Sequence, residues 1–271
     1  MPRIPKLFGL MALPLLLVGC AAPVVPDIVA RLDTLLPTDA ILMGEQHDAP
    51  EHQRAHREVI TALAARGVLA AVTLEMADQG RSTAALDRNA SERSVREALQ
   101  WREAGWNWSS YGPAVMTAVR LGVPVVGANL PRARLRPAME DSTLDALLDG
   151  PAFLTQQEMI REGHCNLLPE PQVVPMTRTQ IARDVAMAQT LVAAAVPGKT
   201  VVMLAGGSHI NRNVGIPQHL PKTFNTRSIL LLARRASDAP DKTSSFDKVW
   251  TTPPVAPKDY CADFKAQQTK R

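Results

Sequence analysis

Five apolar runs alternate with segments of helical periodicity, and this alternation constrains the fold more than any other feature of the chain. The apolar runs cover residues 40–44, 70–76, 123–129, 200–209 and 227–235. Their apolar residues are nearly continuous, which is typical of strands buried on both faces of a sheet. The clearest helical segments are 51–67, 111–122 and 177–196. The sequence therefore predicts an α/β fold with a central, mostly parallel sheet and helices on both faces.

One domain of this kind accounts for most of the chain. We expect it to span residues 35–262, with a helical insertion at about 130–176 that covers one edge of the sheet or a site. From Arg234 onward the chain is rich in Asp, Lys, Pro and Ser, so we expect it to wrap the surface, and residues 263–271 to form a flexible tail. The net charge of +4 is too small to indicate a nucleic-acid partner.

Residues 1–19 have the features of a bacterial leader. A basic start precedes an apolar stretch too short to span a bilayer, and the stretch ends in LVGC. That ending resembles the lipobox of bacterial lipoproteins, the alternative being an ordinary signal peptide with a chance cysteine. The resemblance implies that Cys20 becomes lipidated and that residues 20–34 form a tether. Because Ala21 is not aspartate, it also implies an outer-membrane protein that faces the periplasm or the cell surface.

Cys165 and Cys261 are the cysteines that follow this leader. In an oxidising compartment an even pair is typical of a disulfide. The competing interpretation is a metal-binding thiolate at Cys165, because His164 lies next to it.

Polar groups that can bind a metal or move a proton follow four of the predicted strands. Glu45 and His47 follow the first, Glu75 lies near the end of the second, Asn129 ends the third and His209 follows the fourth. The carboxyl ends of parallel strands share one edge of a sheet, where ligands bind. The sequence therefore predicts a site there, with His47, His209, Glu45 and Glu75 as metal ligands or, for the two glutamates, as catalytic acids or bases.

The first and fourth of these segments share the pattern Gly-x-x-His, in GEQH (44–47) and GGSH (206–209). We expect each glycine to permit a sharp turn after its strand. His52 and His56 then follow at helical spacing, either facing the strand ends or lying on the flank of a helix. For His56 the flank is the favoured interpretation.

Two further segments suggest ligand contacts. WREAGWNWSSYGP (101–113) contains three of the four tryptophans and Tyr111, and is either a hydrophobic lid or a wall for a flat aromatic ligand. A tyrosine phenolate can ligate ferric haem. NLPRARLRP (129–137) carries Arg132 and Arg134, which could hold carboxylates or lie in a solvated turn.

Together these segments resemble the ChaN family of bacterial haem-binding lipoproteins. The resemblance runs in order through LMGEQHDAPEHQRAHREVI, TLEM, GWNWSSYGP, VVGANLPR, GHCNLLP, TRTQIARDVAMA and LAGGSHINRNVGIPQHL. The family belongs to a wider superfamily with the Tiki metalloproteases and erythromycin esterase-like proteins.

The resemblance implies an α/β fold and a haem pair bound cofacially at a homodimer interface for iron acquisition. It implies a tyrosine as iron ligand, for which Tyr111 is the candidate, and a partner-subunit histidine on a propionate. His52, His164 and His209 are candidates for that histidine, with Arg132 and Arg134 as substitutes. An outer-membrane haem receptor or a periplasmic carrier is the implied partner.

The Tiki-type resemblance implies a different function for the same strand ends. It matches Gly44–His47, Gly206–His209 and Glu75, and implies a divalent-metal-dependent hydrolase. We expect a haem-binding protein more than an enzyme. A third interpretation is that these polar residues only tie the strand ends together.

Overall fold

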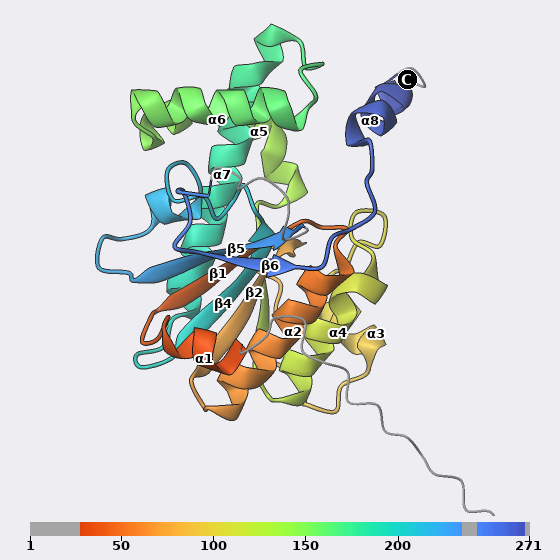
Figure 1. Ribbon diagram of the computed structural model, residues 1–271, viewed down its shortest axis with the longest axis vertical. Coiled ribbons are helices and arrows are strands. Elements are labelled where there is room, and N and C mark those ends of the chain that lie inside the picture. The colour runs from red at the N-terminus through yellow and green to blue at the C-terminus, as the bar shows by residue number, and fades with distance from the viewer. Residues whose placement is uncertain (1–27, 235–242, 269–271) are drawn as a thin grey trace, which may run out of the picture.

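The computed structural model describes residues 28–234 and 243–268, and its centre is a six-stranded parallel sheet (Figure 1). The strand order is β3-β2-β4-β1-β5-β6, and each pair of neighbouring strands is parallel. The strands are β1 (Ala40–Glu45), β2 (Leu69–Asp78), β3 (Val125–Asn129), β4 (Thr200–Gly206), β5 (Thr226–Ala233) and β6 (Lys248–Thr252). The expected α/β class and parallel sheet are therefore confirmed.

One face of the sheet is covered by the helices α1 (Ile28–Asp33), α2 (Pro50–Ala65), α3 (Glu92–Ala98) and α4 (Trp108–Arg120). Helix α2 begins with a proline, which suits the first helical turn, and is followed by Gly67 at φ +69°. Its buried Val59, Ile60 and Leu63 join the larger of the hydrophobic clusters, together with side chains of β1 and β2. Burial of this apolar stripe holds the helix on the sheet.

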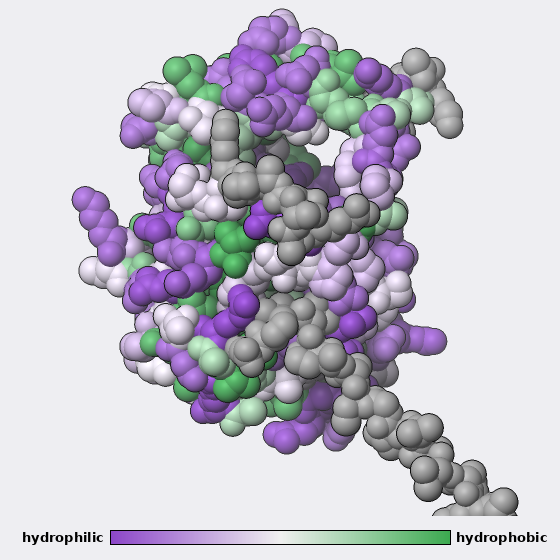
Figure 2. Space-filling model, in the orientation of Figure 1, coloured by the Kyte–Doolittle hydropathy of each residue, from purple (hydrophilic) through white to green (hydrophobic). Residues whose placement is uncertain are grey.

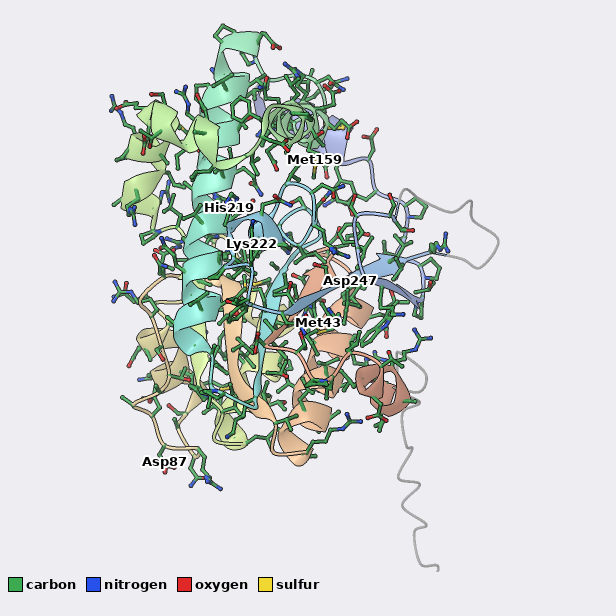
Figure 3. The ribbon with its side chains drawn as sticks, turned by 90° about the vertical axis from the view of Figure 1, so that its left-hand side faces the viewer. Met43, Asp87, Met159, His219, Lys222 and Asp247 are labelled. Atoms are coloured by element: carbon green, nitrogen blue, oxygen red, sulfur yellow. A yellow bond between two sulfur atoms is a disulfide. The ribbon has the colours of Figure 1, made fainter. Side chains whose placement is uncertain are left out.

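The opposite face is covered mainly by the long helix α7 (Glu170–Ala194). Turned by 90°, the molecule shows α7 running along this face from the helical layer that carries Met159 (Figure 3). Met187, Ala188 and Leu191 of α7 pack on side chains of β1 and β4. Both faces of the central strands are therefore buried, which explains their continuous apolar sequences.

The predicted insertion contains α5 (Leu135–Glu140) and α6 (Gly150–Gly163), and the C-terminal helix is α8 (Tyr260–Gln268). A disulfide joins Cys165, just after α6, to Cys261 in α8. The sulfur of Cys165 is therefore bonded to another cysteine, and the alternative of a metal-binding thiolate is wrong. On the face seen in Figure 2, a hollow separates this helical layer from the C-terminal segment.

Two expectations about the chain are corrected. The segment after Arg234 does more than wrap the surface, because it contributes strand β6 with the buried Trp250. Helix α7 begins at Glu170, inside the expected insertion and seven residues before the helix expected at 177–196. Cys20, the leader and most of the tether lie outside the described residues. Within the described part of the chain, no helix is long and apolar enough to cross a membrane.

Candidate functional site

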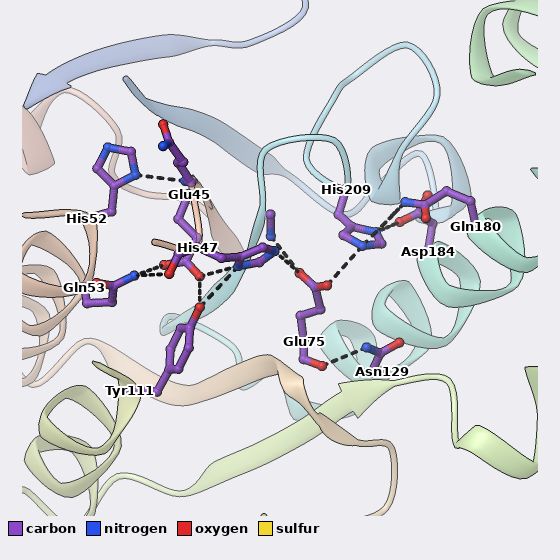
Figure 4. A network of polar contacts seen from close by, with 12 residues as sticks. Glu45, His47, His52, Gln53, Glu75, Tyr111, Asn129, Gln180, Asp184 and His209 are labelled. Carbon is purple, nitrogen blue, oxygen red and sulfur yellow. Dashed lines mark hydrogen bonds and ion pairs between the residues drawn. The ribbon is translucent and has the colours of Figure 1, made fainter. Parts of the chain in front are cut away.

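The carboxyl ends of the central strands carry a connected network of acidic, imidazole and phenol groups (Figure 4). Strand β1 supplies Glu45, β2 supplies Glu75, and the segments after β1 and β4 supply His47 and His209. These strands are adjacent in the sheet, in the order β2-β4-β1. The structure thus brings together the four residues that the sequence places at strand ends.

Glu45 is the centre of the first half of the network. Its Oε1 accepts a hydrogen bond from the Tyr111 hydroxyl at 2.6 Å and lies 2.7 Å from His47 Nδ1. Its Oε2 accepts a hydrogen bond from Gln53 Nε2 at 3.4 Å and lies 3.6 Å from His56 Nδ1. Glu45 therefore joins β1 to α2 and α4.

Glu75 is the centre of the second half. Its Oε2 accepts the Gly206 backbone N–H at 2.7 Å and lies 3.8 Å from His47 Nε2. Its Oε1 lies 3.4 Å from His209 Nε2. On the other side of that ring, His209 Nδ1 lies 2.5 Å from Asp184 Oδ1, so a buried imidazole stands between two carboxylates.

Electrostatics favour the charged forms of Glu75 and His209. Burial alone would raise the pKa of Glu75, but His209, His47 and the Gly206 N–H lower it to about 2. Burial alone would lower the pKa of His209, but Glu75 and Asp184 raise it to about 10. Burial also raises the pKa of Asp184, to about 6, against the opposing charge of His209. At neutral pH, Glu75 is therefore a carboxylate and His209 an imidazolium.

His47 is the accessible member of the network. Its side chain is 40% exposed, whereas those of Glu75 and His209 are 4% and 5% exposed. Burial lowers its pKa, but the hydrogen bond to Glu45 and the charge of Glu75 outweigh burial, so the pKa lies above its ordinary value. A ligand at this edge would therefore meet His47 first.

The glycines of the two Gly-x-x-His motifs have a different role from the one expected. Neither Gly44 nor Gly206 has a positive φ angle. A Cβ on Gly206 would lie 2.9 Å from His47 Nε2, and a Cβ on Gly44 would lie 2.6 Å from Ile210. Both positions lack a side chain because other groups approach the strand closely, and the sharp-turn explanation is wrong.

The Trp/Tyr segment forms an aromatic wall beside His47. The Trp106 ring meets the His47 ring edge-on at 4.8 Å and the Tyr111 ring at 5.8 Å. Tyr111 is only 3% exposed, and burial together with the Glu45 charge raises the pKa of its hydroxyl. An iron ligand needs an open approach and a deprotonated oxygen, and Tyr111 offers neither in this structure.

Of the other residues predicted to contact a haem propionate, His52 is inaccessible, whereas the two arginines are exposed. His52 is fully buried, its Nδ1 accepts the Gln46 N–H at 2.9 Å, and its Nε2 lies 3.0 Å from Thr252 Oγ1. It has no nitrogen left for a propionate. Arg132 and Arg134 are exposed on the short helix that follows β3, at the same edge of the sheet as the network.

His164 is half-buried after α6, away from the network, with Nδ1 2.7 Å from the Ile160 carbonyl oxygen and its ring against Phe264. His56 is fully buried 3.6 Å from Glu45, so it faces the strand ends and the flank interpretation is wrong. Asn129 donates a hydrogen bond to the Glu75 carbonyl oxygen at 2.9 Å. Asn129 therefore links the end of β3 to β2, the strand that carries Glu75.

Sequence reasoning missed Asp184 and Gln180, both on α7. Gln180 Nε2 lies 3.0 Å from His209 Nδ1, and Asp184 is fully buried beside the same ring. Thr177, Gln180 and Asp184 recur at helical spacing, so this polar stripe along the helix was the available signal. Over residues 28–234 and 243–268, no group of three or more His, Cys, Asp or Glu side chains is arranged to hold a metal ion.

Comparison with known proteins identifies the family to which the chain belongs. The family described as "Haem-binding uptake, Tiki superfamily, ChaN" matches residues 31–220. No curated protein matches the sequence. Among solved structures, ChaN of Campylobacter jejuni, described for cofacial haem binding, aligns with a TM-score of 0.68 at 20% identity over 82% of this chain and 90% of that one.

Two weaker structural matches are the type III effector HopBA1, with a TM-score of 0.44 at 16% identity, and a Bacillus cereus protein, with a TM-score of 0.43 at 14% identity. They cover 80% and 76% of this chain, and 88% and 68% of their own chains. The family match extends over most of the described domain and includes the strand ends that carry Glu45, Glu75 and His209. The chain belongs to the ChaN family of haem-binding uptake proteins within the Tiki superfamily.

Proposed function

We propose that this protein binds haem at the carboxyl edge of its sheet, as an outer-membrane lipoprotein that serves iron acquisition. The observation that carries the proposal is the partly exposed His47 ring against Trp106, inside the segment that matches the haem-binding family. Haem is a flat, apolar ring system with two carboxylates. It needs an aromatic or apolar surface, an iron ligand and cations for its propionates.

The residues of this edge fit haem in part. Trp106 and His47 supply an aromatic surface, and the exposed Arg132 and Arg134 supply positive charge. Tyr111 does not fit as an iron ligand while its hydroxyl is buried on Glu45. Tyr260, the second tyrosine of the chain, is 46% exposed, but its hydroxyl is hydrogen-bonded to Asp48 and Gln46, so it is not free to ligate iron in this structure.

The arginine contribution is tested by titrating hemin into Arg132→Ala/Arg134→Ala. We expect the affinity to fall about tenfold, since each guanidinium can form a charge-assisted hydrogen bond with a carboxylate. Arg136→Ala is the matched control, because Arg136 lies in the same segment, is 89% exposed and pairs with Glu140. The loss should disappear with hemin whose propionates are esterified. Equal affinities of wild type and double variant for hemin would contradict this assignment.

A cofacial haem pair at a homodimer interface is proposed from the Campylobacter jejuni relative. Light scattering should then show a monomer or a weak dimer in the absence of hemin. At one hemin per chain it should show a stable dimer. A hemin-bound monomer would exclude the cofacial arrangement.

The membrane anchor is proposed from the lipobox at Cys20. The Cys20→Ala variant should lose acylation and leave the outer-membrane fraction. Unchanged membrane fractionation would contradict the anchor.

Hydrolysis with a divalent metal is the second candidate, and the position of Glu75 between His47 and His209 favours it. Elemental analysis and an absorption spectrum of one fresh preparation separate the two functions. Stoichiometric zinc or manganese that is lost in His47→Ala and His209→Ala would support hydrolysis. A haem spectrum without such a metal supports haem binding.

A further inference from the structure

The C-terminal segment 253–268, here named the strap, reaches the site after leaving strand β6. The Tyr260 hydroxyl donates a hydrogen bond to Asp48 Oδ2 at 2.7 Å and accepts one from Gln46 Nε2 at 3.0 Å. Gln46 and Asp48 are the neighbours of His47 in the chain. One side chain of the strap therefore holds both sides of the turn that carries the accessible histidine.

The strap is also fastened to this turn where it begins. Thr252, the last residue of β6, has its Oγ1 3.0 Å from His52 Nε2. The Nδ1 of the same ring accepts the Gln46 backbone N–H at 2.9 Å. The turn over residues 46–48 is thus held from inside by His52 and from outside by Tyr260.

Burial contributes little to the position of the strap. Between residues 253 and 266, all residues except Val255 and Phe264 are exposed. A segment with so little apolar burial is not held in one place by packing. A covalent link therefore holds the strap in position in place of packing.

That link is the disulfide between Cys261 and Cys165, next in the chain to Tyr260. Cys165 lies in the turn after α6, where Cys165 and Asn166 both have positive φ angles, 59° and 55°. His164 packs its ring against Phe264 of the strap at 5.9 Å. The disulfide therefore fixes the strap to the helical layer and confines Tyr260 to the neighbourhood of residues 46–48.

We propose that Tyr260 is a positioning residue for His47 and that the Cys165–Cys261 disulfide holds it in that role. The strap then borders the ligand site through the contacts of Tyr260 with Gln46 and Asp48. This inference rests on the proposed haem function for the identity of the ligand. The clamp on the turn is a property of the free protein.

The test is amide hydrogen exchange of the ligand-free protein, residues 21–271, read on peptides that cover residues 46–48. In Tyr260→Phe and in Cys165→Ser/Cys261→Ser, we expect exchange there to rise about tenfold, because hydrogen bonds that restrain the turn are lost. Peptides from β4 should stay protected in both variants, as an internal reference for the folded sheet. Thr251→Val is the control, since it removes an exposed hydroxyl just before the strap.

Hemin affinity of the same proteins is the second measurement. We expect it to fall about fivefold or more in Tyr260→Phe and in the double cysteine variant, and to stay unchanged in Thr251→Val. Exchange at residues 46–48 within twofold of wild type in Tyr260→Phe would overturn the inference. If the wild-type chain binds no hemin while exchange rises as expected, the haem function fails and the clamp stands.

Discussion

Asp184 and Glu75 stand on opposite sides of the His209 ring, and this arrangement ties α7 to the strand ends. His209 lies 2.5 Å from Asp184 Oδ1 and 3.4 Å from Glu75 Oε1, in full burial. A buried charge is tolerable when partners of opposite charge surround it, and removal of one partner is costly. The pair of contacts therefore predicts how stability depends on pH.

The stability of the protein should fall as the pH rises from about 7 to 10. The folded pKa of His209 is about 10 and its unfolded value is 6.5, so its contribution is complete below pH 6.5 and lost as the pH approaches 10. His209→Gln should remove this part of the pH dependence, on the order of 3 kcal/mol. The measurement is urea unfolding of both proteins at several pH values.

His219→Gln provides the control for this prediction. Burial lowers the pKa of His219 to about 4, so its contribution changes between pH 4 and 6.5 and leaves the range above pH 7 unaffected. Parallel stability curves for wild type and His209→Gln between pH 7 and 10 would refute the charged state of His209.

Tyr111 is expected to stabilise the fold more than it contributes to haem ligation. Its hydroxyl donates to Glu45 Oε1 at 2.6 Å in a buried environment. Tyr111→Phe should lower the free energy of unfolding by about 1.5–3 kcal/mol, the range for a hydrogen bond to a charged group. Its hemin-bound Soret maximum should match that of wild type. A shifted maximum would restore Tyr111 as the iron ligand.

Among the elements, strand β6 lies at the edge of the sheet and has one buried apolar side chain, that of Trp250. Trp250 is 2% exposed on this edge strand, whereas Lys248 is exposed. Trp250→Ala should destabilise the protein by about 3–5 kcal/mol, and Lys248→Ala by less than about 0.5 kcal/mol. Thermal unfolding monitored by circular dichroism distinguishes the two. Similar melting temperatures for both variants would mean that β6 is dispensable.

The sequence predicted the strands that are buried on both faces and missed the one that is not. The runs predicted at 40–44 and 200–209 contain the central strands β1 and β4, and β4 ends at Gly206. Residues 248–252 read KVWTT, where Trp250 is the one buried apolar side chain and Thr252 the other buried residue, so no apolar run marks the strand. Edge position and low apolar content hide such a strand from pattern analysis.

The site residues at strand ends were predictable from the sequence, whereas the site residues on helices were not. Glu45 and His209 were found because parallel strands bring their carboxyl ends together. Asp184 and Gln53 contribute from helix faces, and only the packing of α7 and α2 on the sheet brings them to the network. Tyr260 contacts Asp48 and Gln46 from a segment held by a disulfide whose two cysteines are 96 residues apart, and no local sequence pattern shows this.

In the molecule as a whole, the sheet presents the network at the carboxyl ends of its strands (Figure 4), and the segment after β6 runs from there to α8 (Figure 1). The helices on both faces bury the strands, so the positions of Glu45 and Glu75 are fixed by the core. The exposed groups at that edge include His47, Asp48, the two arginines and Tyr260. Carboxylates fixed by the core, with exposed side chains around them, suit a binding site for a large flat ligand.

An absorbance titration of residues 21–271 with hemin is the sharpest test of haem binding at this edge of the sheet. We expect a saturable Soret band that is shifted from that of free hemin, reaches its endpoint at one hemin per chain and weakens in His47→Ala. A spectrum that stays that of free hemin at every ratio, or a band that grows without saturation, would mean that the protein has no specific haem site there.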